Sequence, residues 1–365
     1  MACTLPSRPR YPTTRRAPAP ILTSVPVVGV LTAGGDCPGL NAAIRAVVVR
    51  VAAEPDGRVV GILNGWEGLM EGTVRPLGRD DVRGILARGG TILGTSRKDP
   101  YLHGEGLASV LPTLKAEGID RLVVIGGDGS LRTAARLADE GVSVVGIPKT
   151  IDNDIAGTDY SFGFDTAIQV VSDAIDRLTT TAEAHHRIIV LEVMGRTTGW
   201  IAVYGGIAGG AEAILVPEEP YDLADLADRL RRRHEAGHTY SIVVVAEGVP
   251  DPSGAETLAG VDAYGFARLG GVATEIGPAL ERLTGYETRV TILGHLQRGG
   301  TPTAFDRVLA TRMGLAAAEA CLAGASGVMV GVRGSTLTTT DLWEGCAEPR
   351  LVPSDLLAQA RWFFA

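Results

Sequence analysis

The chain has 365 residues, and its 42 Asp and Glu outnumber its 34 Lys and Arg, which gives a formal net charge of −8. Binding to a nucleic-acid backbone depends on clustered Lys and Arg, so this balance argues against nucleic acid as the main partner. Every apolar run is shorter than the roughly 20 residues of a membrane helix, and the N-terminus has no apolar signal stretch, so we expect neither a membrane partner nor secretion.

The first residues differ from the rest of the chain. Residues 1–24 are rich in Pro and Arg, which cannot form a core, and we expect a disordered extension there. From Val25 onward, short apolar runs alternate with amphipathic stretches, which predicts an α/β fold with mainly parallel sheets, and the length favours two lobes. Strands are predicted at Val27–Thr32, Val59–Leu63, Leu122–Ile125, Ser143–Ile147, Ile188–Glu192, Ala213–Val216, Ile242–Ala246, Arg289–Leu293 and Val328–Val332.

Helices are predicted from caps and from apolar spacing. The first should begin at Pro38, with Asp36 near its cap, because Pro suits the first helical position. Apolar residues three and four apart mark a second helix between Asp165 and Leu178, which we expect to open the second lobe. Further helices are predicted at Leu223–His234, Tyr264–Leu283 and Phe305–Ala323.

Two glycine-rich loops follow predicted strands and precede helices. In GGDGS, residues 126–130, Gly126, Gly127 and Gly129 allow main-chain N–H groups to approach a phosphate, and Asp128 can hold a divalent cation such as Mg²⁺. A hairpin turn is the alternative, but the next residues are helical in pattern. The earlier loop GGDCPG, residues 34–39, is either a second phosphate loop or an ordinary tight turn.

The TIDND segment, residues 150–154, supplies carboxylates just after a predicted strand. Asp152 or Asp154 can accept a hydroxyl proton during attack on a phosphorus atom, as a kinase loop Asp does. The alternative is an Asx-rich turn that caps a helix.

Cations follow two later strands, beside glycines. Arg196, His295 and Arg298 are candidates to grip a phosphate, or else they are surface cations. Glu247 is a candidate for sugar hydroxyls, or else a surface or capping carboxylate. His185 and His186 are expected on a surface loop, because no acidic or Cys residue lies at ligand spacing from them. The four cysteines also lack metal-ligand or CxxC spacing, which fits a reduced cytoplasm.

In this order, GGDCPGLNAAIR, GGTILGTSR, GGDGS, TIDND, EVMGR and GHLQRGG make the chain resemble the 6-phosphofructokinase family over nearly all of residues 25–332. The resemblance implies two Rossmann-like lobes and phosphoryl transfer in glycolysis from Mg·ATP, or in some branches pyrophosphate, to the 1-hydroxyl of fructose 6-phosphate. It implies a donor lobe of residues 25–162 and about 297–332, a fructose 6-phosphate lobe of residues 163–296, and residues 333–365 as a C-terminal extension packed on the lobes.

The resemblance also implies roles for individual residues. Asp152 would be the base, Thr150 would seat the sugar, and Asp154 and Arg196 would support the transferred phosphoryl group. Residues expected to contact the phosphoryl donor are Gly34, Arg97, Lys98, Gly127, Asp128 (with magnesium), Gly129, Ser130 and Lys149. Residues expected to contact fructose 6-phosphate are Thr150, Asp152, Met194, Gly195, Arg196, Glu247, His295 and Arg298, with Arg187 and Arg289 reaching a neighbouring subunit's site in a homotetramer or homodimer.

Donor choice in this family is linked to two positions, here Gly129 and Lys149. Gly129 leaves room for a nucleoside and favours ATP, whereas Lys149 suits either ATP or pyrophosphate, as in a mixed-substrate bacterial branch. The effector site of bacterial relatives retains Arg45 but has Thr73, Thr179 and HEAGHTY at residues 234–240, so we expect a weak or altered response to ADP and phosphoenolpyruvate.

Two other classes of protein share part of this pattern. NAD and lipid kinases use a GGDG loop but have no need for the TIDND and GHLQRGG segments. A non-catalytic sugar-phosphate-binding paralogue would be favoured by loss of Asp128 or Asp152, and both are present. At the end of the chain, Trp362, Phe363 and Phe364 are expected to cover an apolar groove.

Overall fold

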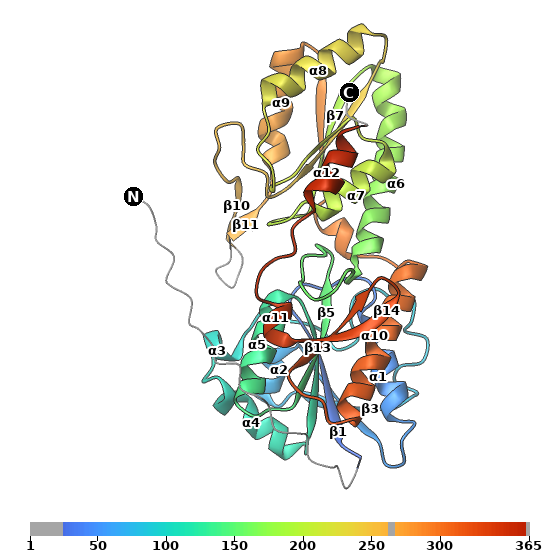
Figure 1. Cartoon of the computed structure of the whole chain (residues 1–365), viewed down its shortest axis with the longest axis vertical. Helices are drawn as coiled ribbons and strands as arrows, with labels where there is room; N and C mark the ends of the chain where they lie inside the picture. Colours follow the sequence, from blue (N-terminus) through green and yellow to red (C-terminus); the bar gives the residue numbers. More distant parts are fainter. Residues whose placement is uncertain (1–24, 262–266, 363–365) are drawn as a thin grey trace.

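The computed structural model describes residues 25–261 and 267–362, which form two α/β lobes stacked along the long axis of the molecule (Figure 1). The first lobe is built on an eight-stranded sheet of order β14-β13-β5-β4-β1-β2-β3, with β6 paired to β5, within the described residues. Its strands are β1 Val27–Ala33, β2 Arg58–Ile62, β3 Val74–Leu77, β4 Arg121–Gly126, β5 Val144–Thr150, β6 Phe162–Gly163, β13 Val328–Arg333 and β14 Thr336–Asp341.

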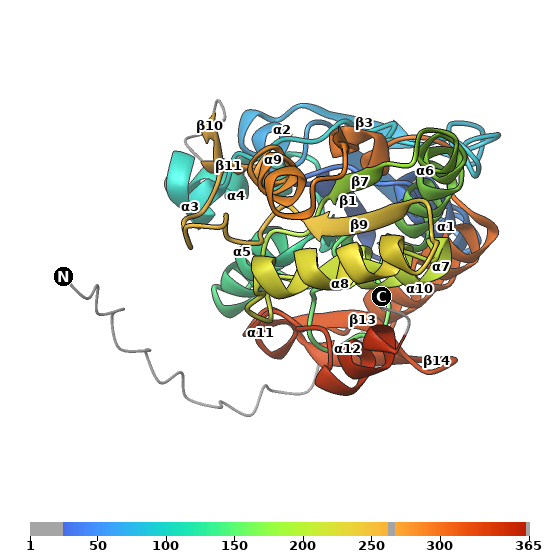
Figure 2. The same ribbon diagram turned by 90° about the horizontal axis from the view of Figure 1, so that it is seen from above.

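The central strands of this sheet are parallel, and the two edge strands β3 and β14 are antiparallel to their neighbours. Strand β4 is buried along its whole length, as expected where helices cover both faces. The helices of this lobe are α1 Leu40–Val51, α2 Trp66–Glu71, α3 Pro100–His103, α4 Leu107–Ala116, α5 Asp128–Asp139, α10 Ala304–Leu322 and α11 Leu342–Gly345. Viewed from above, α1 and α10 lie on one side and α3, α4 and α5 on the other (Figure 2).

The second lobe is built on a parallel sheet of order β12-β7-β9-β8. Its strands are β7 Ile188–Val193, β8 Ala213–Leu215, β9 Ser241–Ala246 and β12 Thr288–Ile292, and the hairpin β10 Leu258–Val261 and β11 Ala267–Leu269 stands apart. The helices of this lobe are α6 Phe164–His185, α7 Trp200–Gly209, α8 Leu223–Glu235, α9 Val272–Thr284, α12 Ser354–Arg361 and the 3₁₀ turn η1 Gly294–Arg298.

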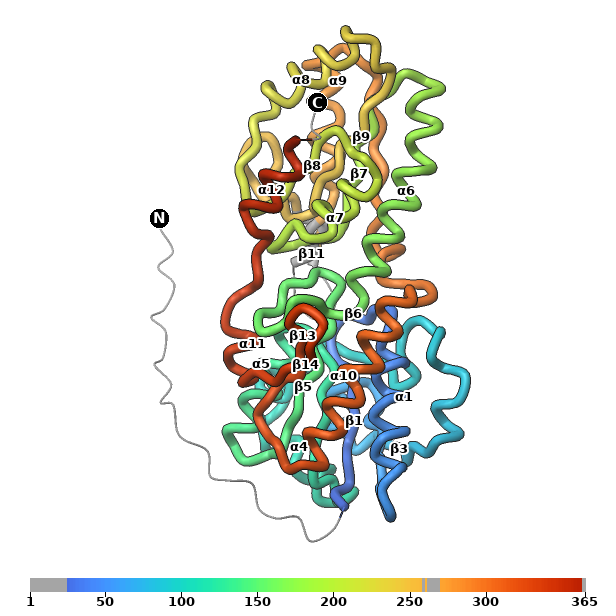
Figure 3. The backbone as a smooth tube through the Cα atoms, turned by 45° about the vertical axis from the view of Figure 1, so that its right-hand side comes forward, coloured from blue at the N-terminus to red at the C-terminus, as the bar shows by residue number. Residues whose placement is uncertain are grey.

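The last part of the chain connects the lobes a final time. After β14 and α11 in the first lobe, it runs along the molecule to α12, which packs beside α7 in the second lobe (Figure 3). Among the described residues, no helix has both the length and the apolar character needed to cross a bilayer.

The predicted fold class is confirmed, and each of the nine predicted strands overlaps an observed one. The first helix was predicted to begin at Pro38 but begins at Leu40, because Gly39 adopts a left-handed φ of 108° and ends the turn before it. The packing of Phe162 also requires a glycine at position 39, because an added Cβ would lie 2.8 Å from the Phe162 ring. Asp36 does not cap this helix, which has no side-chain cap.

Two further expectations are wrong. The helix predicted from Tyr264 begins only at Val272, after strand β11 and two glycines with positive φ, Gly270 and Gly271. Trp362 was expected to cover an apolar groove, but its side chain is 87% exposed, and Phe363 and Phe364 lie outside the described residues. Residues 1–24 also lie outside them, so the predicted disorder there is untested.

Candidate active site

A cavity of about 580 Å³ opens at the carboxyl ends of β1, β4 and β5, where parallel α/β sheets bind ligands. Residues of both lobes line it, since Arg196 follows β7 of the second lobe and Arg298 ends η1. The predicted site residues that line the cavity are Gly34, Arg97, Lys98, Gly127, Asp128, Gly129, Ser130, Lys149, Thr150, Asp152, Asp154, Arg196 and Arg298.

The GGDGS segment turns directly from strand β4 into helix α5. Gly127 caps α5 without a side-chain hydrogen bond, so the first-turn N–H groups and the positive end of the helix dipole are directed at the cavity. An added Cβ at Gly129 would meet nothing within 4 Å, whereas one at Gly126 would lie 2.4 Å from the Cβ of Ser130. Gly126 is therefore required by packing, and Gly129 leaves open space in the cavity.

The first glycine loop lies beside the GGDGS segment, since an added Cβ at Gly34 would be 3.5 Å from Ser130 Oγ. Gly34 has a left-handed φ of 79°, and its N–H donates to Ser96 O at 3.0 Å while Thr95 Oγ1 donates to Gly34 O at 2.7 Å. The next residue, Gly35, admits the guanidinium of Arg298, because an added Cβ would lie 1.9 Å from its Nη1 atom. The loop thus lets Arg298 reach the floor of the cavity.

Lys149 lies beneath both glycine loops. Its side chain is buried, and Nζ donates a hydrogen bond to Gly35 O. Burial lowers the pKa of Lys149, and the neighbouring positive charge of Arg298 acts in the same direction. The ammonium is thus held at the base of the cavity rather than on its rim.

The TIDND loop carries two carboxylates with perturbed acidity. Burial raises the pKa of Asp152, opposed by the positive charges of Arg298 and Lys149. Burial and then the charge of Asp152 raise the pKa of Asp154 to about 7. Two nearby carboxylates in a partly enclosed cavity resist simultaneous ionisation, and such groups are suited to proton transfer near neutral pH.

The shape of this loop is set by its own polar groups. The N–H of Asp152 donates to Thr150 Oγ1 at 3.0 Å, and Asn153 has a left-handed φ of 53°. The Asn153 side chain accepts from the N–H of Ser161 at 2.9 Å. The next helix, α6, has Gly163 as its N-cap with no side-chain cap, so the alternative reading of TIDND as a helix cap is wrong.

Three predicted residues of the second lobe lie beside the cavity without lining it. Met194 is buried, and its N–H donates to Gln297 Oε1 at 3.2 Å. Gly195 has a positive φ of 139°, and there is no space for a Cβ at this position, because it would lie 2.6 Å from Thr198 O. Burial and then the charge of Asp152 raise the pKa of Glu247, which follows β9, to about 7. The electrostatic interaction with Asp152 indicates that Glu247 lies near the TIDND loop.

The remaining predicted residues are farther away. His295 is exposed on η1 and does not line the cavity. Arg187 and Arg289 lie at the starts of β7 and β12, at the end of the sheet opposite to the cavity, and both pair with Glu287. Within one chain these two arginines are not part of the site.

Sequence reasoning missed several lining residues. The cavity is also lined by Trp66, Asp99, Leu102, Arg132, Thr133 and Arg136. Arg132, Thr133 and Arg136 follow GGDGS on α5. Their spacing from Asp128 along this helix could have indicated that they line the same cavity. Buried Gln297 was also missed, although it lies within the GHLQRGG motif and joins Met194 to Gly294 through hydrogen bonds of 3.2 and 3.0 Å.

The residues of the cavity are compatible with a magnesium ion brought by a phosphate ligand. Among residues 25–261 and 267–362, no group of three His, Cys, Asp or Glu side chains could hold a metal on its own. Asp128 lines the cavity and forms an ion pair with Arg132 at 3.0 Å. Mg²⁺ is commonly held by one or two carboxylates together with substrate phosphates, so this single carboxylate fits that mode.

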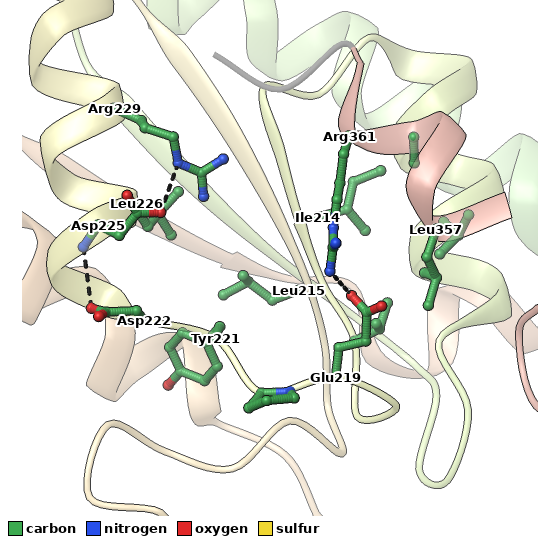
Figure 4. A pocket seen from close by; sticks show the side chains of 14 residues that line it. Ile214, Leu215, Glu219, Tyr221, Asp222, Asp225, Leu226, Arg229, Leu357 and Arg361 are labelled. Atoms are coloured by element: carbon green, nitrogen blue, oxygen red, sulfur yellow. Dashed lines mark hydrogen bonds and ion pairs between the residues drawn. The ribbon is translucent and has the colours of Figure 1, made fainter. Parts of the chain in front are cut away.

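A second cavity, of about 330 Å³, lies in the second lobe between α8, β8 and α12 (Figure 4). Leu215, Leu226 and Leu357 form much of its apolar wall. Its two arginines are neutralised locally, because Arg229 pairs with Asp225 at 3.2 Å and Arg361 pairs with Glu219. None of the predicted site residues lines it.

Comparison with known proteins settles the family. The family model described as Phosphofructokinase matches residues 27–321. The chain belongs to the phosphofructokinase family. Phosphofructokinases are phosphotransferases that act on fructose 6-phosphate, and this assignment excludes the NAD and lipid kinases.

The relatives divide by phosphoryl donor. The chain is 51% identical to the pyrophosphate–fructose 6-phosphate 1-phosphotransferase of Amycolatopsis methanolica, over 92% of this chain and 99% of that protein. It is 48% identical to ATP-dependent 6-phosphofructokinase 3 of Streptomyces coelicolor, over 91% of this chain and 98% of that protein. Similar identities to both types leave the donor to be argued from the site.

The fold also matches solved structures of the family. Phosphofructokinase from Pichia pastoris in its T-state superposes with a TM-score of 0.78 and 33% identity. The match covers 90% of this chain but only 36% of the yeast chain, so this phosphofructokinase spans about a third of that chain's length.

Proposed function

We propose that this phosphofructokinase transfers the γ-phosphoryl group of Mg·ATP to the 1-hydroxyl of fructose 6-phosphate, giving fructose 1,6-bisphosphate and ADP. The observation that carries the proposal is the meeting of the α5 N-terminus and the TIDND carboxylates in one cavity. An anion-binding helix end next to a base is the arrangement that phosphoryl transfer to a hydroxyl requires.

In the proposed mechanism, the first-turn N–H groups of α5 and the residues Gly34, Arg97 and Lys98 hold the donor phosphates. Asp152 accepts the proton of the 1-hydroxyl as its oxygen attacks phosphorus, and Thr150 fixes the loop through the N–H of Asp152. Arg196 and Arg298, which line the same cavity, offset the negative charge that the reacting groups bring together. Asp154 would help to align the transferred group.

Magnesium bound through Asp128 would neutralise the phosphates and orient them. Arg132, four residues on in α5, already pairs with Asp128 at 3.0 Å and also donates to Cys346 O at 2.8 Å. The guanidinium thus keeps the Asp128 carboxylate at the cavity wall. On the acceptor side, Met194, Gly195, Glu247 and His295 are proposed to bind the sugar.

The open space at Gly129 supports ATP as the donor. An added Cβ at Gly129 has no neighbour within 4 Å, and Trp66, Leu102 and Arg136 line the same cavity. A pyrophosphate ion would fill only a part of this cavity, whereas the nucleoside of ATP needs additional space. The volume of about 580 Å³ is within the range of ligand sites that hold drug-sized molecules.

Pyrophosphate is the second candidate, and Lys149 is compatible with it. Lys149 Nζ is buried at the base of the cavity, and in its protonated form it would place a positive charge beside a compact, highly charged donor. The relative from Amycolatopsis methanolica is named for this donor.

We further propose a homotetramer or homodimer in which Arg187 and Arg289 complete a neighbouring site, and a cytoplasmic location. The latter is supported by Cys37, Cys321 and Cys346, which are free thiols in the described residues. The proposed lobe boundaries, near residues 162 and 297, follow the change from the first sheet to the second and back.

A parallel donor assay tests the function. Purified enzyme with fructose 6-phosphate and Mg²⁺ receives either ATP or pyrophosphate, and fructose 1,6-bisphosphate is followed through coupling to aldolase. We expect a higher kcat/KM with ATP. Preference for pyrophosphate would replace the first proposal by the second, and no product with either donor would overturn both.

A further inference from the structure

The C-terminal segment of residues 346–361, here called the strap, crosses between the lobes (Figure 3). On its way it contacts the TIDND loop, since the N–H of Arg350 donates to Asp154 O. The point of contact is Arg350, a partly buried residue that does not line the cavity. Nothing in the sequence motifs of the family resemblance marked this position.

Arg350 closes the loop that carries the two carboxylates. Its Nη2 atom donates to Asn153 O at 3.0 Å and to Asp159 O at 2.8 Å. Its backbone N–H donates to Asp154 O at 2.7 Å, and the preceding residue Pro349 forms an isolated β-bridge with Ile155. One residue therefore binds the main chain at both ends of the turn formed by residues 153–159.

This turn has a conformation that needs external support. Asn153 holds a left-handed φ of 53°, which non-glycine residues adopt at a cost that surrounding contacts must offset. Its side chain is fixed from the inside by the N–H of Ser161. Arg350 binds its carbonyl from the outside, so both contacts help to hold the residue next to Asp152.

The same arginine connects the loop to the second lobe. Its guanidinium carbon lies 4.0 Å from the ring centre of Trp200, and Trp200 Nε1 donates to Arg350 O at 2.7 Å. Trp200 begins α7 directly after the MGRTTG loop that carries Arg196. A stacked planar cation with several N–H donors is a role that Arg fills and Lys does not.

A second contact of the strap holds the same loop of the second lobe. Val352 N donates to Glu218 Oε1 at 3.1 Å, and Glu218 accepts from the N–H of Gly199 with both oxygens at 2.9 Å. The strap thus binds the segment that carries the proposed base and the segment that carries Arg196, one from each lobe.

We propose that Arg350 is a positioning residue for phosphoryl transfer, which holds the TIDND loop and the Arg196 loop in register across the two lobes. The proposal rests on the proposed role of Asp152 as base. Displacement of a reacting group by about 1 Å can lower a rate by about 10²-fold, so loss of this support should affect the chemical step more than donor binding.

The test compares Arg350→Met with Arg361→Met. Arg361 belongs to the same strap but pairs with Glu219 at the surface, so its removal controls for general loosening of the strap. We expect Arg350→Met to lower kcat by roughly 10- to 100-fold with little change in KM for the phosphoryl donor, and Arg361→Met to keep the wild-type kcat. Arg350→Lys should recover only part of the loss, because an ammonium cannot bind both carbonyls in a plane over Trp200.

Hydrogen exchange gives a readout that does not depend on activity. Amides of residues 151–161 should exchange faster in Arg350→Met than in wild type, and should not do so in Arg361→Met. Unchanged exchange there, or a kcat per folded enzyme equal to that of wild type, would overturn the proposal. If Arg350→Met does not fold, Arg350→Lys and Trp200→Phe decide by the same two measurements.

The outcomes separate this proposal from the proposed function. If wild-type enzyme makes no fructose 1,6-bisphosphate with either donor, the proposed function fails, and the exchange comparison alone shows whether Arg350 holds the loop. If wild type is active and the exchange of the loop is unchanged in every Arg350 variant, only the positioning role fails.

Discussion

At the scale of single residues, Asp152 and Asp159 belong to the same loop but have different surroundings. Asp152 faces the cavity, where Arg298 and Lys149 offset part of the effect of burial on its pKa. Asp159, at the far end of the loop, instead pairs with Arg333 at 3.0 Å and accepts from the N–H of Gly334 at 2.7 Å. The two side chains offer a matched pair for mutation.

Asp152→Asn should lower kcat by about 10²–10⁴-fold, because the amide cannot take the proton of the attacking hydroxyl. The Tm should change little, since the variant keeps the shape of the side chain and removes a charge that burial disfavours. Steady-state kinetics and a thermal melt give both quantities. Asp159→Asn serves as the control and should keep most of its turnover, and near-native turnover of Asp152→Asn would remove Asp152 from the mechanism.

The acidity of the same loop predicts a pH dependence. Burial, and then the charge of Asp152, raise the pKa of Asp154 to about 7, and burial raises the pKa of Asp152 above its ordinary range. The proposed base, Asp152, acts only when it is unprotonated, and its pKa is raised. The value of kcat/KM for fructose 6-phosphate should therefore fall as the pH is lowered, starting at a higher pH than for an ordinary Asp and in the limit by about tenfold per pH unit.

Glu247 is the control for this assignment, because burial and the charge of Asp152 also raise its pKa to about 7. In Glu247→Gln the fall of kcat/KM at low pH, here called the acid limb, should remain, although KM for the sugar should increase. If the acid limb disappears in this variant, it reports the titration of Glu247, and the prediction for Asp152 and Asp154 is wrong.

At the scale of helices and strands, the packing of α1 on α10 supports the first sheet beneath the site. The helices approach each other at Gly314, where an added Cβ would lie 2.5 Å from Ala43 O and 2.8 Å from the Cβ of Ala46. Contacts of this kind with backbone cannot be relieved by a side-chain rotation.

Gly314→Ala should therefore lower the free energy of unfolding by roughly 1–3 kcal/mol, as overpacking does. In an open helix the same change would stabilise by about 1 kcal/mol, so the sign itself reports the close packing. Urea unfolding measures the difference. Glu319→Ala, also on α10, loses only an exposed pair with Arg50 at 3.6 Å and should change stability by less than about 1 kcal/mol. A stabilised Gly314→Ala would contradict the prediction.

Elements with clear local signals were predictable from sequence. Helix α8 was predicted to begin at Leu223, as it does, because Asp222 accepts from the N–H groups of Ala224 and Asp225. The helix predicted from Tyr264 failed because apolar spacing does not reveal the β10–β11 pairing, and the glycines at 270 and 271 were the neglected stop signal. The edge strand β14, with its threonines, is fixed by pairing with β13 rather than by a hydrophobic pattern.

The same distinction holds for the site. Gly129, Asp128 and Asp152 were predicted from contiguous motifs, and all three line the cavity. Arg350 could not be found, because its contacts to residues 153, 154 and 159 join parts of the chain that are nearly 200 positions apart. Trp66 and Leu102 were missed for a similar reason, since their place in the cavity follows from tertiary packing.

At the scale of the whole molecule, the predicted sugar-phosphate residues fall into two groups. Arg196 and Arg298 reach the cavity between the lobes, whereas Arg187 and Arg289 lie at the opposite end of the second sheet. Both of the latter are partly exposed and share the carboxylate of Glu287, with Arg187 Nε at 2.7 Å from Glu287 Oε2. Neither arginine lines the cavity of its own chain, which is why we propose that they act through another copy of the chain.

Complementation between two inactive variants tests this arrangement. Asp152→Asn lacks the proposed base, and Arg289→Ala lacks a cation that we propose for a neighbouring site, so each homo-oligomer should have low activity. In a mixed oligomer, some sites combine an intact Asp152 from one subunit with an intact Arg289 from its neighbour. Activity should therefore return when the two variants are unfolded together and refolded as a mixture, and not when they are refolded apart and then assayed together at once.

The formation of mixed oligomers must be shown in the same experiment, by differently tagged subunits that elute together. In the control mixture, Lys115→Ala takes the place of Arg289→Ala. Lys115 is a cation on α4 of the first lobe, outside the proposed site, so this variant should be active by itself and shows how much activity survives refolding. If tagged hybrids form and activity does not return, Arg289 acts within its own chain or not at all. The proposed sharing of a site between subunits would then be wrong.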